Sequence, residues 1–152
     1  ARVVSLSLKQ FQELYQIRAS LEGLACKLAA QHIDKKQILA LRDVLRLHAE
    51  DENFKAGKGY YLQEGQDDFH YCIIKSSGNK TLEKMLCDEL YHQCSNTPDR
   101  PIEAWDEHIR ILDAIAEGDG ELAEMLMHRH INASYKIVEH TLLQTQGEHQ
   151  HG

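Results

Sequence analysis

The sequence predicts an all-α fold, an antiparallel bundle of six or seven helices. Two observations lead to this expectation. Apolar residues recur at helical spacing along nearly the whole chain, and no segment alternates apolar and polar residues as a half-buried strand does. The 152 residues include only two prolines, Pro98 and Pro101, so long stretches contain nothing that breaks a helix. The length is that of one domain with a sizeable core.

Four helices are expected in the first part of the chain. The first covers residues 8–32. Asp34 is a suitable N-cap for the second, which ends at the glycines of "KAGKG" and carries Ile38, Leu41, Val44 and Leu45. The third covers residues 60–75 and ends at "SSGN". Asn79 then caps a fourth helix, whose apolar positions are Leu82, Met85, Leu86 and Leu90.

Two further helices complete the predicted bundle. The fifth follows the turn "SNTPDRP" and covers residues 102–116, and the sixth follows "EGDG" and covers residues 121–143. Because the connections are short, neighbouring helices should pack antiparallel. Residues 1–7 are expected to be a linker remnant and residues 144–152 a flexible tail, which leaves residues 8–143 as the helical domain.

The overall composition excludes several classes of protein. A net charge of −7 argues against this chain binding a phosphate backbone by itself. We find no apolar run long enough to span a membrane and no signal peptide. The four cysteines form no Cys-x-x-Cys pair, which favours free thiols in a reducing cytoplasm over a cysteine zinc site. We therefore expect a cytoplasmic protein.

Three of the ten histidines fall on the apolar stripes of three different predicted helices. They are His70, His108 and His130, while His32 and His48 lie on inward stripes only at helix ends, where histidine often serves the C-terminal dipole. One inward histidine is usually a core residue with a good hydrogen bond. Three of them would bury three imidazoles, each with a ring nitrogen that needs a partner, and one divalent metal would satisfy all three. A metal site and a set of hydrogen-bonded core histidines are both open on this pattern alone.

Polar residues near these stripes are candidates for further roles at the site. Gln66 and Asp67 precede His70 by four and three residues, which puts both on its side of the helix, and the Asp67 carboxylate is the better metal ligand. Arg18 lies near the apolar stripe of the first helix. It either forms an intrahelical pair with Glu22 or points its guanidinium at a carboxylate ligand in the bundle.

Three stretches resemble one known family. "LYQIRASLEGLACKLAAQHI" resembles the first helix of the FCD domain, the effector-binding domain of FadR-type regulators of the GntR family. "QDDFHYCIIKSSGN" resembles that domain's Asp-x-x-x-His segment and the Gly-Asn turn after it. "EHIRILDAIAEGDGELAEMLMHRHI" resembles its last two helices, each with one metal-binding histidine. The resemblance covers residues 8–143.

The resemblance implies a fold, a cofactor and a ligand. Such domains are all-helical bundles, many of which hold a divalent metal through one aspartate and three histidines. The histidines match His70, His108 and His130, and zinc is the first expectation, with nickel or manganese as alternatives. Here Gln66 occupies the position of the family's aspartate, so the fourth ligand would be Gln66, Asp67 or a water. The effector would be a small organic acid or sugar acid, which Arg18 helps to hold.

The resemblance also implies partners. The intact regulator is a homodimer that binds DNA through an N-terminal winged helix-turn-helix domain, which is absent from this chain. The alternative is a small helical-bundle metalloenzyme, in which three histidines leave room for a water nucleophile. It would need a general base, for which Asp67 and Glu107 are the candidates. The resemblance favours the sensor, which performs no catalysis.

Overall fold

The computed structural model describes residues 7–50, 63–90 and 101–151. These ranges contain six α-helices, one short π-helix and no strand, which confirms the all-α prediction. In chain order the elements are α1 (Leu8–His32), α2 (Lys35–Glu50), α4 (Gln63–Ser76), α5 (Lys80–Lys84), η1 (Met85–Leu90), α7 (Pro101–Ala116) and α8 (Gly120–His151).

Side chains cap the N-termini of several helices. Ser7 and Gln10 form a reciprocal capping box at the start of α1. The Asp34 carboxylate accepts a hydrogen bond from the Gln37 amide at 2.8 Å, and Asn79 Oδ1 accepts one from the Leu82 amide at 3.0 Å. The two N-caps predicted from the sequence are therefore confirmed.

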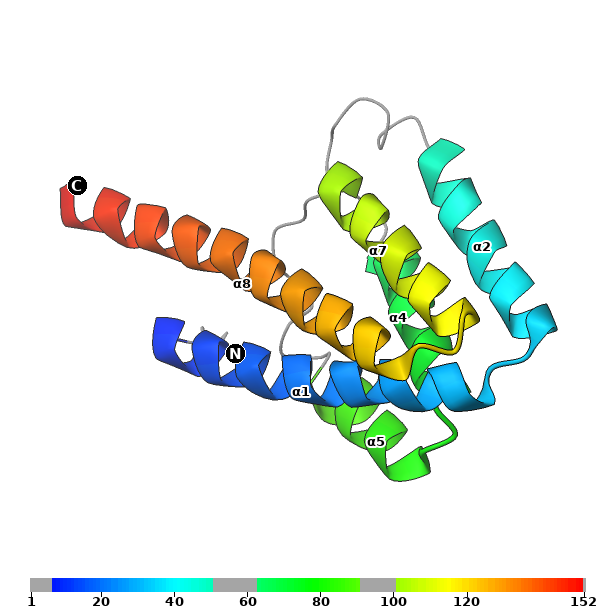
Figure 1. Ribbon diagram of the computed structural model, residues 1–152. Coiled ribbons are helices and arrows are strands. Elements are labelled where there is room, and N and C mark those ends of the chain that lie inside the picture. The colour runs from blue at the N-terminus through cyan, green and yellow to red at the C-terminus, as the bar shows by residue number, and fades with distance from the viewer. Residues whose placement is uncertain (1–6, 51–62, 91–100, 152) are drawn as a thin grey trace.

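The first and last helices lie side by side along the bundle. Figure 1 shows α1 and α8 running antiparallel, with the end of α8 extending past the other helices. α7 leads into α8 through a tight turn at Gly118, whose φ of 76° suits glycine. α2 packs against α7 and α4, and α4 packs against α1. The core between them includes Phe69, Ile73, Leu86, Ile111, Ile115 and Met127.

Gly23 allows α1 and α8 to approach closely. A Cβ atom at this position would lie 2.4 Å from His128 Nε2 on α8, which is far inside contact distance. His128 has the polar helical neighbours Glu124 and Asn132, which predict an exposed position. This prediction is wrong for the imidazole ring, because its Nε2 atom is buried and has no hydrogen-bond partner among the described residues. The reason is the glycine opposite, whose missing side chain leaves room for the imidazole.

Two elements differ from the helices expected. The fourth helix becomes a π-helix from Met85 onward, a wide turn that keeps Leu82, Leu86 and Leu90 all on the buried side. The last helix continues to His151 instead of ending at Leu143. It does so because "QTQGEHQ" contains no proline, and one glycine costs a helix only about 1 kcal/mol. Residues 60–62 of the expected third helix lie outside the described ranges.

None of the helices in the described ranges combines the length and the apolar character that a bilayer crossing needs.

Candidate metal centre

Three histidines from three helices meet in the interior of the bundle. His70 lies on α4, His108 on α7 and His130 on α8, and they are only 1%, 3% and 2% exposed. One ring nitrogen of each lies within 4.8 Å of the others. The Nε2 atom of His130 is 3.1 Å from His108 Nε2 and 3.3 Å from His70 Nε2. The sequence expectation that these three histidines point inward is met, and the fold brings them together.

The rings pack against one another and against the core. Phe69 stacks on His108 with a centroid distance of 4.3 Å and an interplanar angle of 23°. The His70 ring lies nearly parallel to that of His130, at 25°, and nearly perpendicular to that of His108, at 80°. Because close packing limits each ring to one orientation, the three Nε2 atoms are held facing one another before any ligand arrives.

Two carboxylates determine which ring nitrogen carries the proton in His70 and in His130. Glu22 on α1 accepts a hydrogen bond from His70 Nδ1, and Glu107 on α7 accepts one from His130 Nδ1 at 2.7 Å. An ionised carboxylate can only accept, so Nδ1 of each ring must be the donor. In the neutral imidazoles, Nε2 then carries a lone pair that points into the cluster. Carboxylates behind metal-binding histidines commonly play this part in proteins.

This arrangement of donors fits a divalent metal. Lone pairs on facing nitrogens about 3 Å apart repel unless a cation lies near them. Burial lowers the pKa of His130 to about 4, although its hydrogen bond to Glu107 opposes the shift. His130 is therefore neutral near pH 7, and a neutral imidazole is the form that binds metal. Imidazole donors suit zinc, nickel and other first-row transition metals.

Arg18 is linked to the histidine cluster through Glu22. Its Nε donates to Glu22 Oε2 at 2.5 Å, while the other oxygen of the same carboxylate accepts from His70. The Arg18 side chain is 11% exposed, and its guanidinium carbon lies 5.4 Å from the centre of the Tyr15 ring. The intrahelical Arg18–Glu22 pair is present. The same carboxylate contacts His70, so Glu22 lies between the guanidinium and the histidine cluster.

A family model described as the FCD domain matches residues 13–133. The chain belongs to the FCD domain family. The matched range includes the three histidines, Glu22 and Arg18.

Curated relatives of this FCD domain are named as transcriptional regulators, not as enzymes. The chain is 27% identical over 155 residues to an uncharacterized HTH-type transcriptional regulator, YdhC, of Bacillus subtilis (strain 168), a match that covers 92% of this chain and 65% of the relative. It is 26% identical over 147 residues to a probable D-xylose utilization operon transcriptional repressor of Paenarthrobacter nicotinovorans, covering 92% and 63%. A shorter match, 36% over 74 residues, is to the Nta operon transcriptional regulator of Aminobacter aminovorans, covering 49% and 34%. The chain thus spans less than two thirds of these relatives' lengths.

Sequence reasoning missed the role of Glu22 in this FCD domain. Helical spacing predicts Glu22 only as a partner for Arg18, yet the residue is 1% exposed and its carboxylate accepts a hydrogen bond from His70. The available signal was a carboxylate on the same face of α1 as Tyr15 and Cys26, both fully buried. Glu107, considered as a general base, instead lies behind His130 at Nδ1, on the side of the ring away from the cluster.

Gln66 and Asp67 are the two candidates for a fourth metal ligand from the protein. They belong to α4 and precede His70 by four and three residues. The side chains of both residues are outside the part of the chain that the structure describes.

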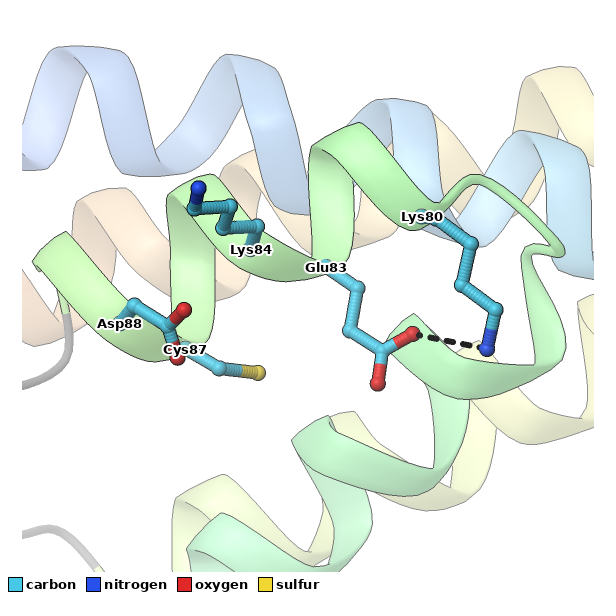
Figure 2. Close-up of a pocket in the computed structure, with 5 residues that line it drawn as sticks. All are labelled: Lys80, Glu83, Lys84, Cys87 and Asp88. Carbon is cyan, nitrogen blue, oxygen red and sulfur yellow. Dashed lines mark ion pairs between the residues drawn. The ribbon is translucent and has the colours of Figure 1, made fainter.

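The FCD domain also has a surface hollow that is separate from the histidine cluster. Figure 2 shows it along α5 and η1, with a volume of about 300 Å³ and a lining of Lys80, Glu83, Lys84, Cys87 and Asp88. Lys80 Nζ and Glu83 Oε2 lie 3.6 Å apart across it, and the lysine is 91% exposed. Burial, followed by the charges of Glu83 and Asp88, raises the pKa of the Cys87 thiol to about 11. A protonated thiol among exposed charged side chains makes a poor binding site.

Proposed function

We propose that this chain is the ligand-sensing domain of a GntR/FadR-type transcription regulator and that it binds a small carboxylate effector at a divalent metal in the helix bundle. The observation that carries the proposal is the meeting of three buried Nε2 atoms, from α4, α7 and α8, with two of the three rings oriented by carboxylates. Family membership and the relatives' names support a regulatory role over a catalytic one.

In this proposal the chain's own residues hold the metal and admit the acid. His70, His108 and His130 supply three neutral ligands, and Gln66 or Asp67 supplies the fourth. Zinc is our first candidate, with nickel or manganese as alternatives. When bound, the metal provides a fixed positive charge for one carboxylate oxygen of the effector. Arg18 adds a charge-assisted hydrogen bond to the effector.

Regulation follows from the helices that the cluster joins. One ligand on each of α4, α7 and α8 means that metal and effector together constrain the relative positions of three helices. For this to control transcription, the effector must bind one geometry of the regulator better than another. We propose a cytoplasmic homodimer that contacts DNA through an N-terminal winged helix-turn-helix domain, with an organic acid or sugar acid as the signal.

Elemental analysis of the purified protein tests the metal site. We expect near-stoichiometric metal in the wild type after dialysis against zinc and removal of the excess, and a large loss in His108→Ala. His32→Ala is the matched control, because His32 is exposed at the end of α1. Equal metal in the wild type and in His108→Ala would exclude His108 as a ligand, and no metal in the wild type would contradict the proposed site.

A thermal-shift screen of organic acids and sugar acids tests the sensor role on the metal-saturated protein. An acid that raises the melting temperature of the wild type should do so less in Arg18→Ala, and mass spectrometry should recover it unchanged. Chemical conversion of the acid would contradict the sensor and favour an enzyme.

A further inference from the structure

We infer that Glu22 is a positioning residue that couples Arg18 to the metal-binding histidine His70, so that capture of an anion and capture of a metal depend on each other through one buried carboxylate. The inference rests on the proposed function, since it assumes a metal at the histidine cluster. It adds a route of regulation within that site which is independent of direct contact between metal and effector.

The geometry singles out Glu22 among the carboxylates near the cluster. Its two oxygens have different partners: Oε1 accepts from His70 Nδ1 on α4, and Oε2 accepts from Arg18 Nε one turn earlier on α1. Its side chain is 1% exposed. Glu107 offers the comparison, because it also accepts from a cluster histidine, His130, but is 27% exposed and comes from α7.

Burial makes Glu22 dependent on Arg18. A buried carboxylate is costly unless a cation and hydrogen bonds compensate for its lost hydration. Arg18 supplies that cation through a short contact within the same helix. If the guanidinium is removed, the carboxylate loses this cation and gains by moving away from His70 toward water. Glu107 depends less on a compensating cation, because water reaches its carboxylate.

The position of His70 depends in turn on Glu22. The hydrogen bond from Nδ1 fixes both the tautomer and the direction of Nε2, and loss of such a carboxylate typically weakens metal binding by about 10- to 100-fold. An acid that draws the Arg18 guanidinium toward itself therefore alters how firmly Glu22 holds His70. By linkage, metal binding must alter the affinity of Arg18 for the acid by the same factor.

A double-mutant cycle on zinc affinity tests this coupling without knowledge of the effector. Zinc affinity is measured by competition with a chromophoric chelator, in buffer free of carboxylates, for the wild type, Arg18→Met, Glu22→Gln and the double variant. We expect Arg18→Met to weaken zinc binding by about fivefold or more in the wild type and by less than about twofold in the Glu22→Gln background. Methionine retains much of the buried arginine stem.

Glu107→Gln is the matched control. It also removes a carboxylate from a cluster histidine and should weaken zinc binding, but Arg18→Met should retain its full effect in this background. Arg18→Lys keeps the compensating charge and should bind zinc within about threefold of the wild type. This conservative variant separates coupling through charge from a general loss of packing, and it serves as the test if circular dichroism shows that Glu22→Gln is unfolded.

The results separate the inference from the proposed function. An equal effect of Arg18→Met in the wild-type and Glu22→Gln backgrounds, or no effect in either, overturns the coupling while leaving the metal site intact. If Glu22→Gln does not fold, equal zinc affinities for Arg18→Met and Arg18→Lys overturn it. A wild-type protein that binds no zinc overturns the proposed site and the coupling together.

Discussion

His108 and His130 face each other with their Nε2 atoms 3.1 Å apart. They lie on consecutive helices, α7 and α8, which are joined by a short turn. The α7–α8 hairpin thus carries two of the three histidines of the candidate metal centre, and α4 supplies His70 from a more distant part of the chain. Removal of His70 should therefore leave a preformed pair of ligands, whereas removal of His130 takes away the ring whose Nε2 lies within 3.3 Å of both others.

We predict that His70→Ala retains weak zinc binding and that His130→Ala binds zinc more weakly still. Both should lose more than about 100-fold relative to the wild type, since loss of a direct ligand exceeds the 10- to 100-fold cost of losing a carboxylate behind it. Chelator competition at pH 7.5 measures both affinities, with His32→Ala as control. Wild-type affinity in either variant would remove that histidine from the site.

The metal-free protein should lose stability in acid because of His130. Its pKa is lowered from 6.5 to about 4, mainly by burial, so the unfolded chain takes up a proton near pH 6.5 that the folded chain does not accept until about pH 4. The contribution of His130 to stability is complete above pH 6.5 and is lost as the pH falls toward 4, with a slope of up to about 1.4 kcal/mol per pH unit.

Urea unfolding of protein dialysed against a chelator, at several values of pH between 7 and 4, measures this slope. His130→Gln is the comparison, because it keeps a polar group but does not titrate. The variant should show a smaller fall in the free energy of unfolding over this range. Equal slopes in the two proteins would show that other groups cause the acid sensitivity.

Gly23→Ala should destabilise the fold at the contact between α1 and α8. The new methyl group would lie 2.4 Å from His128 Nε2, so the ring must move. Overpacking typically costs about 1–3 kcal/mol, and alanine recovers up to about 1 kcal/mol in helix propensity. We expect a net loss of about 1 kcal/mol in the free energy of unfolding. His128→Ala in the same chain should remove most of this loss, and an unchanged penalty in the double variant would exclude the proposed clash.

Alkylation should show that Cys87 is a slow nucleophile. Its pKa is raised to about 11 by burial and by the carboxylates of Glu83 and Asp88, so the thiolate is the disfavoured form at pH 8. Peptide mass spectrometry after treatment with iodoacetamide should give a rate about tenfold below that of an unperturbed thiol. The rate should continue to rise up to about pH 11. A plateau near pH 9 would show an ordinary thiol.

Much of the fold could be predicted because helical periodicity is local. The stripes that contain His70, His108 and His130 follow from spacing alone, and so do the caps at Asp34 and Asn79. Periodicity shows which face of a helix is buried but does not show which buried faces meet. The link from Arg18 through Glu22 to His70 therefore appeared in the sequence only as an intrahelical pair.

Two local features, the burial of the His128 ring and the π-helix at Met85–Leu90, differ from the sequence prediction. His128 has polar neighbours on its own helix, and only the absence of a side chain at Gly23, on a helix distant in sequence, makes room for its ring. The π-helix at Met85–Leu90 lies in a run whose leucines, four residues apart, predict an ordinary α-helix. Neither feature can be predicted from the residues of one helix alone.

The pairing of α1 with α8 has a consequence for the order of folding. The two helices are the first and the last of the domain in sequence, yet they pack side by side (Figure 1) and form the most extensive helix pair in the described ranges. On the ribosome, α1 emerges long before α8. A nascent chain can therefore complete the packing of α1 only after α8 has been synthesised, and contacts so distant in sequence slow the final folding step.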